Sequence, residues 1–353
     1  MGISCISHGE LLLTVYQALE NATVNELVEI DDTYLDRLTY RRQIMSEYSN
    51  IVLAASPRIK PAVDELYTWM CTVYLPTRFP TIFALSRPQN ANGVLMLTNK
   101  VTSETLPTVP YPDPVDSLRT LGSHIDLDML FLLPSESSSY ANPGPSPSTP
   151  TQQAYTLEGF ITCFPNGFDT SQKLSLTLAA IHNPVPRYSE KLEKSMDRFF
   201  ARIPVGTFVK RANWTVTTNS ELFAPSGNHF YAGEEKGASA TMSAREGAEA
   251  EAEGAKEKSG VEFEQEDVGV NGEKAWVRCE AQMLHRLPDT KALVFSFKTY
   301  MYTLAQIKEE GDDVAEMLAQ AIEGMERGSV PEIYTYKRGV AWGRSAVRFL
   351  RGK

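Results

Sequence analysis

The 353-residue sequence has no closely spaced cysteines. Its four cysteines lie far apart and form no C-x-x-C motif; they are Cys5, Cys71, Cys163 and Cys279. This spacing excludes a zinc-ribbon site, and it disfavours the disulfide framework that small secreted proteins build from clustered cysteines. We therefore expect the protein to work in a reducing compartment, and the cytoplasm is the predicted location.

The sequence also lacks an excess of positive charge. It contains 34 lysines and arginines against 44 aspartates and glutamates, which gives a formal net charge of -10. A surface that binds nucleic acid needs basic side chains to neutralise phosphates, so nucleic acid is not an expected partner. No run reaches the ~18 consecutive apolar residues of a membrane-spanning helix, so no membrane span is expected.

Common catalytic motifs are missing as well. The sequence contains no G-x-S-x-G elbow, no P-loop, no G-x-G-x-x-G fingerprint and no H-E-x-x-H motif. It therefore offers no recognisable serine nucleophile, phosphate-binding loop, dinucleotide site or zinc-protease site.

Two segments have little that a folded core could bury. Residues 134–152 are rich in proline and serine, which is typical of a flexible loop. Residues 232–274 are rich in Glu, Ala, Gly and Lys and are predicted to be disordered, although part of this insert has the composition of a solvated single helix. Residues 1–27 show no clear pattern. The rest, from 28 to 345, is predicted to form a single domain that the two disordered inserts interrupt.

Periodic patterns predict both helices and long strands. Helical spacing of apolar residues occurs at 31–49, at 58–75, where Pro76 and Pro80 are expected to end the helix, and at 312–327. Alternating patterns predict strands at 208–217, 276–284 and 293–302, with a shorter strand at 93–98. Long strands that follow earlier helices indicate an α+β domain.

The predicted strands carry polar side chains on one face. In the strand at 208–217, alternation separates Phe208, Trp214 and Val216 from Arg211, Asn213 and Thr215. In the strand at 276–284 the apolar face consists of Val277, Cys279, Ala281 and Met283. Its opposite face presents Arg278, Glu280 and Gln282 together.

A short helix is predicted between Asp169 and His182. An apolar strand at 160–164 stops at a turn, after which Asp169 is a candidate N-cap with Gln172 as its capping-box partner. Prolines that follow His182 prevent the helix from continuing. Its apolar face is expected to consist of Leu174, Leu178 and Ile181.

His182 is rigidly placed, between the end of this helix and the segment Pro184-Val185-Pro186. Rigid placement suits a metal ligand or a catalytic base, and it equally suits a histidine that caps the helix. A lone histidine is more often a capping or hydrogen-bonded residue than a ligand. Its position alone leaves these roles open.

Four stretches of the chain share their order with a known family. They are IDDTYLDRLTYRR at 30–42, the helix ending in RFPTIF at 64–83, the block at 159–225, and the strand and turn at 277–300. The strongest motifs are IHNPVP, KRANWTV, and the strand that carries Arg278, Glu280 and Gln282 and ends in RLP. In these motifs the chain, from about residue 28 to 343, resembles the haem-dependent oxidative N-demethylases of bacteria and fungi.

The resemblance implies a PAS-like fold, in which an antiparallel sheet and flanking helices hold a ligand. It also implies haem b as cofactor, because His182 falls in the IH-x-P-V-P turn of the family. A neutral imidazole nitrogen would bind the iron while an acceptor holds the other N–H. Four further histidines are weaker candidates; they are His8, His124, His229 and His285, of which His285 stands where the family usually has arginine.

The resemblance further implies that the polar strand faces line the ligand site. Arg278 would bind a haem propionate or orient bound oxygen, Gln282 would hydrogen-bond substrate, and Glu280 would belong to the same polar wall. Arg211 is a second candidate for propionate contact. The alternative is a solvated strand face with an exposed ion pair. The chain departs from the family where Ala281 replaces a second arginine and Met283 a threonine.

The implied function is oxidation of an N-methyl group of a small amine by dioxygen, with release of formaldehyde. Because the chain has no nicotinamide or flavin motif, the electrons would come from a separate reductase or through a peroxide shunt. One alternative is a PAS-like haem or small-ligand sensor without turnover, and another is an interaction protein without cofactor. A sensor and an enzyme can share a proximal ligand, so the sequence does not separate them.

Overall fold

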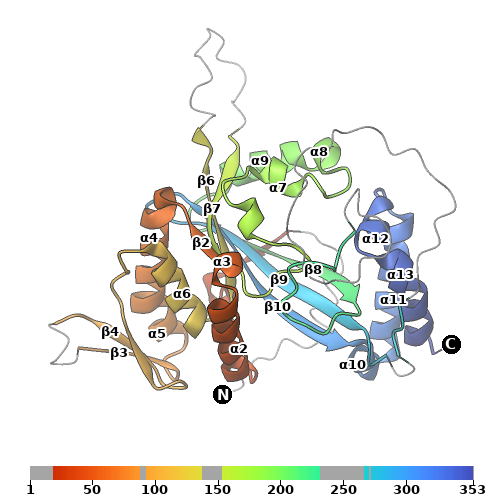
Figure 1. The fold of residues 1–353 in the computed structure, drawn as a ribbon, viewed down its shortest axis with the longest axis horizontal. Helices are drawn as coiled ribbons and strands as arrows, with labels where there is room; N and C mark the ends of the chain where they lie inside the picture. Colours follow the sequence, from red (N-terminus) through yellow and green to blue (C-terminus); the bar gives the residue numbers. More distant parts are fainter. Residues whose placement is uncertain (1–18, 88–92, 137–152, 231–265, 270–271, 353) are drawn as a thin grey trace, which may run out of the picture.

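The computed structural model describes residues 19–87, 93–136, 153–230, 266–269 and 272–352. A seven-stranded sheet with the order β1-β8-β9-β10-β6-β7-β2 forms its centre (Figure 1). All neighbouring strands of this sheet are antiparallel. The strands are β1 (Glu20–Ala22), β2 (Leu53–Ala55), β6 (Asp128–Pro134), β7 (Tyr155–Ile161), β8 (Phe208–Thr217), β9 (Trp276–Arg286) and β10 (Leu293–Thr303).

A second, three-stranded sheet consists of β3 (Phe83–Ser86), β4 (Met96–Asn99) and β5 (Glu104–Pro107). Mixed helices and antiparallel sheets confirm the predicted α+β class. No helix in the described part of the chain is long and apolar enough to cross a membrane.

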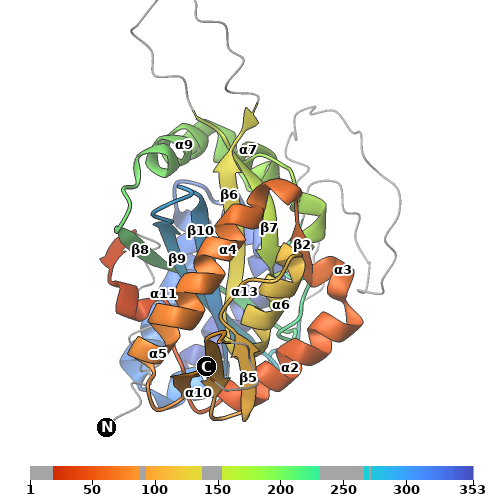
Figure 2. The ribbon, with the colours of Figure 1, turned by 90° about the vertical axis from the view of Figure 1, so that its left-hand side faces the viewer.

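Three groups of helices surround the central sheet (Figures 1 and 2). The first comprises η1 (Val24–Glu26), α2 (Tyr34–Glu47), α3 (Ser49–Val52), η2 (Pro57–Ile59), α4 (Lys60–Trp69), the π-helix η3 (Met70–Tyr74), α5 (Leu75–Arg78) and α6 (Pro114–His124). The second comprises η6 (Ser171–Lys173), α7 (Leu178–His182), α8 (Tyr188–Lys191) and α9 (Glu193–Arg202). The third comprises α10 (Leu304–Glu309), α11 (Asp312–Arg327), α12 (Glu332–Tyr336) and α13 (Gly339–Leu350).

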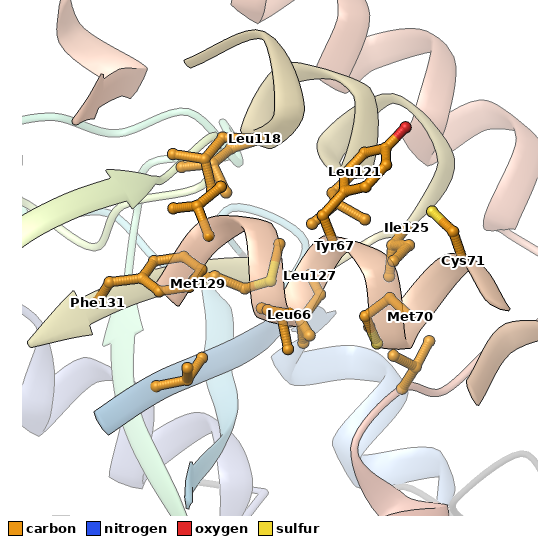
Figure 3. Packing of buried hydrophobic residues seen from close by; sticks show 14 of the residues in the cluster. Leu66, Tyr67, Met70, Cys71, Leu118, Leu121, Ile125, Leu127, Met129 and Phe131 are labelled. Carbon is orange, nitrogen blue, oxygen red and sulfur yellow. The ribbon is translucent and has the colours of Figure 1, made fainter. Parts of the chain in front are cut away.

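The alternation of side chains along β8 and β9 assigns these groups to the two faces of the sheet. Cys279 and Trp214 pack with α10, α11 and α13. Met283 and neighbouring strands pack against α2, α4 and α6, and Figure 3 shows part of this cluster. On the opposite face, Val209 and Leu284 pack against α7 and α9. The α7–α9 group therefore covers the sheet face that was predicted to carry the polar side chains.

The helix predicted at 58–75 was expected to end before Pro76, and this is wrong. The helix passes through the π-turn η3, in which Leu75 N donates to Met70 O, and continues as α5 to Arg78. The wider turn changes the hydrogen-bonding register. Pro76 then lies in the first turn of α5, where the missing N–H of a proline costs no helical hydrogen bond.

The single helix predicted between Asp169 and His182 is also wrong. The segment forms η6 and α7, separated at Ser175, whose φ is 66°. Ser175 N donates to Leu157 O at 2.7 Å, which ties the break to β7. Asp169 and Gln172 are hydrogen-bonded to each other, but the N-cap of α7 is Thr177, which accepts from Ala180 N. Tertiary hydrogen bonds to β7 thus outweigh the local capping signal.

Other predictions are corrected in detail. The helix after Ser189 is predicted from the sequence to bury Leu192, Met196, Phe199 and Phe200. In the structure Phe200 is buried, but Leu192 is 46% exposed at the junction of α8 and α9. Residues 1–27 showed no clear pattern in the sequence, but the part of this segment that the structure describes is folded: β1 pairs with β8 and Leu27 is buried. Most of the two predicted inserts lies outside the described residues. Of the acidic insert, Val268 is buried in the core cluster of α10–α13.

Candidate functional site

β8 and β9 bring six polar side chains together on the face beneath α7–α9. The cross-strand pairs are Arg211 with Gln282, Asn213 with Glu280, and Thr215 with Arg278. The exposed fraction is 0% for Arg278, 3% for Glu280 and 6% for Gln282. The alternative of a solvated strand face is therefore wrong, and this polar surface is enclosed.

Neutral donors hold one of the two carboxylate oxygens of Glu280. Its Oε2 accepts from Gln282 Nε2 at 2.7 Å and from Asn213 Nδ2 at 3.2 Å. Gln282 in turn accepts from Arg211 Nε at 2.6 Å. The second oxygen, Glu280 Oε1, is buried without a hydrogen-bond partner in the described structure. Because nearly all buried polar atoms have a partner, this oxygen marks a place where a ligand or a water would bind.

Arg278 fixes two loops beside the polar surface. Its Nη2 donates to the carbonyl oxygens of Phe164, Pro165 and Leu222 at 2.8, 3.0 and 2.9 Å, and its Nη1 donates to Glu221 O at 3.2 Å. Burial lowers its pKa to about 10, which Glu280 opposes, so the side chain stays charged at neutral pH. Its Nε has no partner within the described structure. Most of the hydrogen bonds that Arg278 donates therefore go to the two loops.

The helix in the 30–42 motif supports the same loop from the other side. Arg41 is fully buried in α2 and donates to Asp128 at 2.7 Å and to two backbone carbonyls. Asp128 accepts from the backbone N–H groups of Cys163 and Phe164 at 2.9 and 2.8 Å. This motif, to which no chemistry was assigned, thus has a structural role next to the site.

His182 has the hydrogen bond of a neutral ligand-type histidine. Its Nδ1 lies 2.8 Å from Leu178 O, and since a carbonyl only accepts, Nδ1 carries the proton and Nε2 keeps its lone pair. The ring stacks on Tyr188 with centroids 4.7 Å apart and planes 14° apart. Burial lowers the pKa to about 4, so the imidazole is neutral at pH 7. Hydrogen bonding within its own helix and readiness to ligate a metal therefore coexist.

Two lysines belong to the site and were not predicted. Lys173 on η6 places Nζ 4.0 Å from the centroid of the Phe168 ring, and burial lowers its pKa to about 8. Lys337, at the end of α12, reaches over the edge of β8 and donates to Trp214 O at 2.6 Å and to Asn213 Oδ1 at 3.3 Å. Neither lies in a motif, and Lys337 is 124 residues away from Asn213, so only the fold could identify them.

Positive charge is in excess at this surface. Lys173, Arg211, Arg278 and Lys337 all sense the carboxylate of Glu280, yet none forms an ion pair within 4.0 Å in the described part of the chain. Two of them sense a further carboxylate, Asp169 for Lys173 and Asp128 for Arg278. Backbone carbonyls solvate Arg278 and Lys337. Lys173 Nζ and the terminal nitrogens of Arg211 have no such acceptor among the described residues. A half-buried cation without an acceptor is unfavourable, so these two groups favour an anionic ligand.

The weaker candidate histidines lie apart from this arrangement or beside it. His8 lies outside the described residues. His124 and His285 are buried elsewhere, whereas His229 stacks on Tyr336 with centroids 4.5 Å apart and senses the charges of Lys337 and Lys173. Where the structure is described, no group of three or more His, Cys, Asp or Glu side chains could hold a bare metal ion. A surface hollow beside Trp69 and Val73 contains none of the site residues.

Burial of neutral histidines is expected to lower the free energy of unfolding in acid. Burial lowers the pKa of His285 from 6.5 to about 4, and neither of its ring nitrogens has a partner where the structure is described. The unfolded chain therefore binds more protons between these values. Stability is full above pH 6.5 and falls as the pH drops towards 4, by on the order of 3 kcal/mol for this residue. Urea unfolding at pH 7.5 and 4.5 should show a smaller loss for His285→Leu than for wild type; equal losses would contradict the assignment.

The sequence comparison covers almost the whole of this structure. Residues 18–347 match the model of a family described as haem-dependent oxidative N-demethylase, alpha subunit-like. The matched range includes His182, Arg211 and the polar residues of β9. No curated protein matches the chain.

Proposed function

The chain belongs to the haem-dependent oxidative N-demethylase, alpha subunit-like family, and on that premise we propose that it is a haem b oxidoreductase which demethylates a small methylated amine with dioxygen. The observation that carries the proposal is the state of His182. Its imidazole is neutral, its Nδ1–H is held by Leu178 O, and Nε2 has no partner among the described residues. These features support a role as proximal ligand, since the tautomer of such a histidine is fixed by a second group.

The surroundings of His182 fit haem in two further respects. Apolar side chains from α7–α9 and the sheet pack together in one cluster next to His182, and side chains of this kind suit the faces of a macrocycle: Leu130, Phe160, Leu174, Leu178, Ile181, Phe199, Leu284 and Phe295. On the same face of the sheet, Arg211 presents terminal nitrogens that have no partner within the described structure. Guanidinium groups bind carboxylates through two parallel hydrogen bonds, so Arg211 is suited to a propionate.

Each polar residue has a proposed role around the cofactor. Haem, when bound, supplies the oxygen activation that the protein side chains lack. Gln282 orients the Arg211 guanidinium through the hydrogen bond to Nε, and its amide also fixes Glu280. Glu280 and Gln282 form the wall that faces the amine. Arg278 acts mainly by holding the loops at 164–165 and 221–222, and its free Nε leaves one donor for a propionate or oxygen.

The sheet supports a PAS-like interpretation of the fold. The five long strands form one antiparallel sheet in which the first and last of them, β6 and β10, are neighbours. The helices between β7 and β8 cover one face, where the ligand is proposed to bind. Cys71, Cys163 and Cys279 are buried free thiols, which supports a reducing, cytoplasmic location.

The reaction requires electrons from outside the chain. Oxidation of R–NH–CH₃ by O₂ with two electrons and two protons gives R–NH₂, formaldehyde and water. We therefore expect a separate reductase as partner, since the sequence has no nicotinamide- or flavin-binding motif.

Turnover tests this function. The full chain reconstituted with haemin, reduced, and mixed with oxygen and a series of methylated amines should release one formaldehyde per demethylated amine, faster than free haemin does. Reversible oxygen binding without formaldehyde from any amine would contradict the enzyme and support the sensor.

A further inference from the structure

Lys173 has no hydrogen-bond acceptor or ion-pair partner in the described part of the chain, although Asp169 lies within electrostatic range. Its Nζ contacts the face of Phe168, and no carbonyl or carboxylate in the described structure accepts from it. The nearest acid in sequence, Asp169, uses both oxygens within its own turn, accepting from Ser171 and Gln172. Burial lowers the pKa of Lys173 to about 8, which is the expected effect when a buried ammonium lacks a partner. Lys173 therefore favours an external carboxylate.

Glu280 provides the opposite charge within electrostatic range of Lys173. Its Oε2 is held by two amides, so the carboxylate is fixed in position, while Oε1 is buried and unpartnered. An ammonium group would give Oε1 the donor that it lacks. Glu280 raises the pKa of Lys173, and Lys173 lowers that of His182. Lys173 therefore lies within electrostatic range of both Glu280 and His182.

We propose that the substrate is an N-methylated amino acid, whose ammonium group binds Glu280 Oε1 and whose carboxylate binds Lys173. This inference rests on the proposed function and names the class of amine. A simple dialkylamine satisfies Glu280 but leaves Lys173 without a partner. An amino acid, by contrast, carries both charges about two bonds apart and places its N-methyl group at the same polar wall.

Two other ligands could satisfy Lys173 and Glu280, and the test must distinguish them from an amino acid. A haem propionate could pair with Lys173, since it presents the same carboxylate chemistry. Arg211 is the better propionate donor, because its terminal nitrogens have no acceptor among the described residues and its orientation is fixed by Gln282. A bound water could satisfy Glu280 Oε1, in which case an ammonium group would gain little there.

N-methylglycine and dimethylamine make a matched pair for the test, since they differ only by the carboxylate. Calorimetric titration of each into the haem-loaded full chain should give a Kd about tenfold or more lower for N-methylglycine. Lys173→Met should abolish this difference, and Lys173→Arg should keep most of it. Lys194→Met on α9, at an exposed lysine, is the control and should leave the difference intact. Glu280→Gln should weaken binding of both amines by about tenfold or more, because its Oε1 loses its charge.

These measurements separate the substrate class from turnover. Lys173-dependent preference for N-methylglycine in a protein that releases no formaldehyde would support the inference and contradict the proposed oxidation. Equal affinities of the wild type for the two amines would overturn the inference, whatever the variants do. Loss of the Soret band in Lys173→Met would also overturn it, because Lys173 would then serve a propionate.

Discussion

Replacement of Arg278 by alanine is expected to lower the free energy of unfolding by about 3–5 kcal/mol. The guanidinium is fully buried and donates to the carbonyls of Phe164, Pro165, Glu221 and Leu222. Without it, these acceptors lose their donor and the two loops lose the group that joins them. Urea denaturation of the wild type and the variant at pH 7 measures the effect.

Two further variants show whether geometry or charge is responsible. Arg278→Lys should recover only part of the stability, since one ammonium group cannot reach carbonyls on both loops as the planar guanidinium does. Arg327→Ala removes a side chain that is 75% exposed and should change stability little. If Arg278→Ala were as harmless as Arg327→Ala, the buried clamp between the loops would be disproved.

Replacement of His182 by alanine is expected to lower haem affinity by more than about 100-fold while the protein remains folded. The iron loses its protein ligand, whereas the fold loses only a hydrogen bond within α7 and the stacking on Tyr188. Haemin titration followed at the Soret band measures the affinity, and circular dichroism reports the fold.

The matched control is His285→Leu. His285 is also buried and neutral, but it stacks on Phe208 on the opposite face of the sheet and has no polar partner. Its removal should leave the Soret titration unchanged. Retention of full haem affinity by His182→Ala, or its loss in His285→Leu, would contradict the proposed ligand.

The sequence was most informative along β8, β9 and β10. Alternation over ten or more residues leaves one register that buries Trp214, Val277 and Cys279, so the shared face of Arg278, Glu280 and Gln282 followed from the pattern. The helix at 312–327 was predicted with its observed bounds for a similar reason, because its apolar residues repeat over four turns.

The remaining features depend on contacts between distant segments. Ser175 breaks the predicted helix because its N–H bonds to Leu157 on β7, which no local capping rule records. Lys337 enters the site from the end of α12, and His229 from a loop beside the acidic insert. Arg278 was predicted to contact a ligand, and the structure adds a second role, since its side chain also holds two loops. Its residue type was clear from the sequence, but its partners are backbone carbonyls, which have no sequence signature.

Resonance Raman spectroscopy of the ferrous, haem-loaded full chain tests the central claim most directly. Ligation by His182 predicts an iron–nitrogen stretching band that shifts when the protein is labelled with ¹⁵N-histidine and that is absent from His182→Ala. A band that is insensitive to the label, or that persists unchanged in His182→Ala, would show that another group ligates the iron and would contradict the site described.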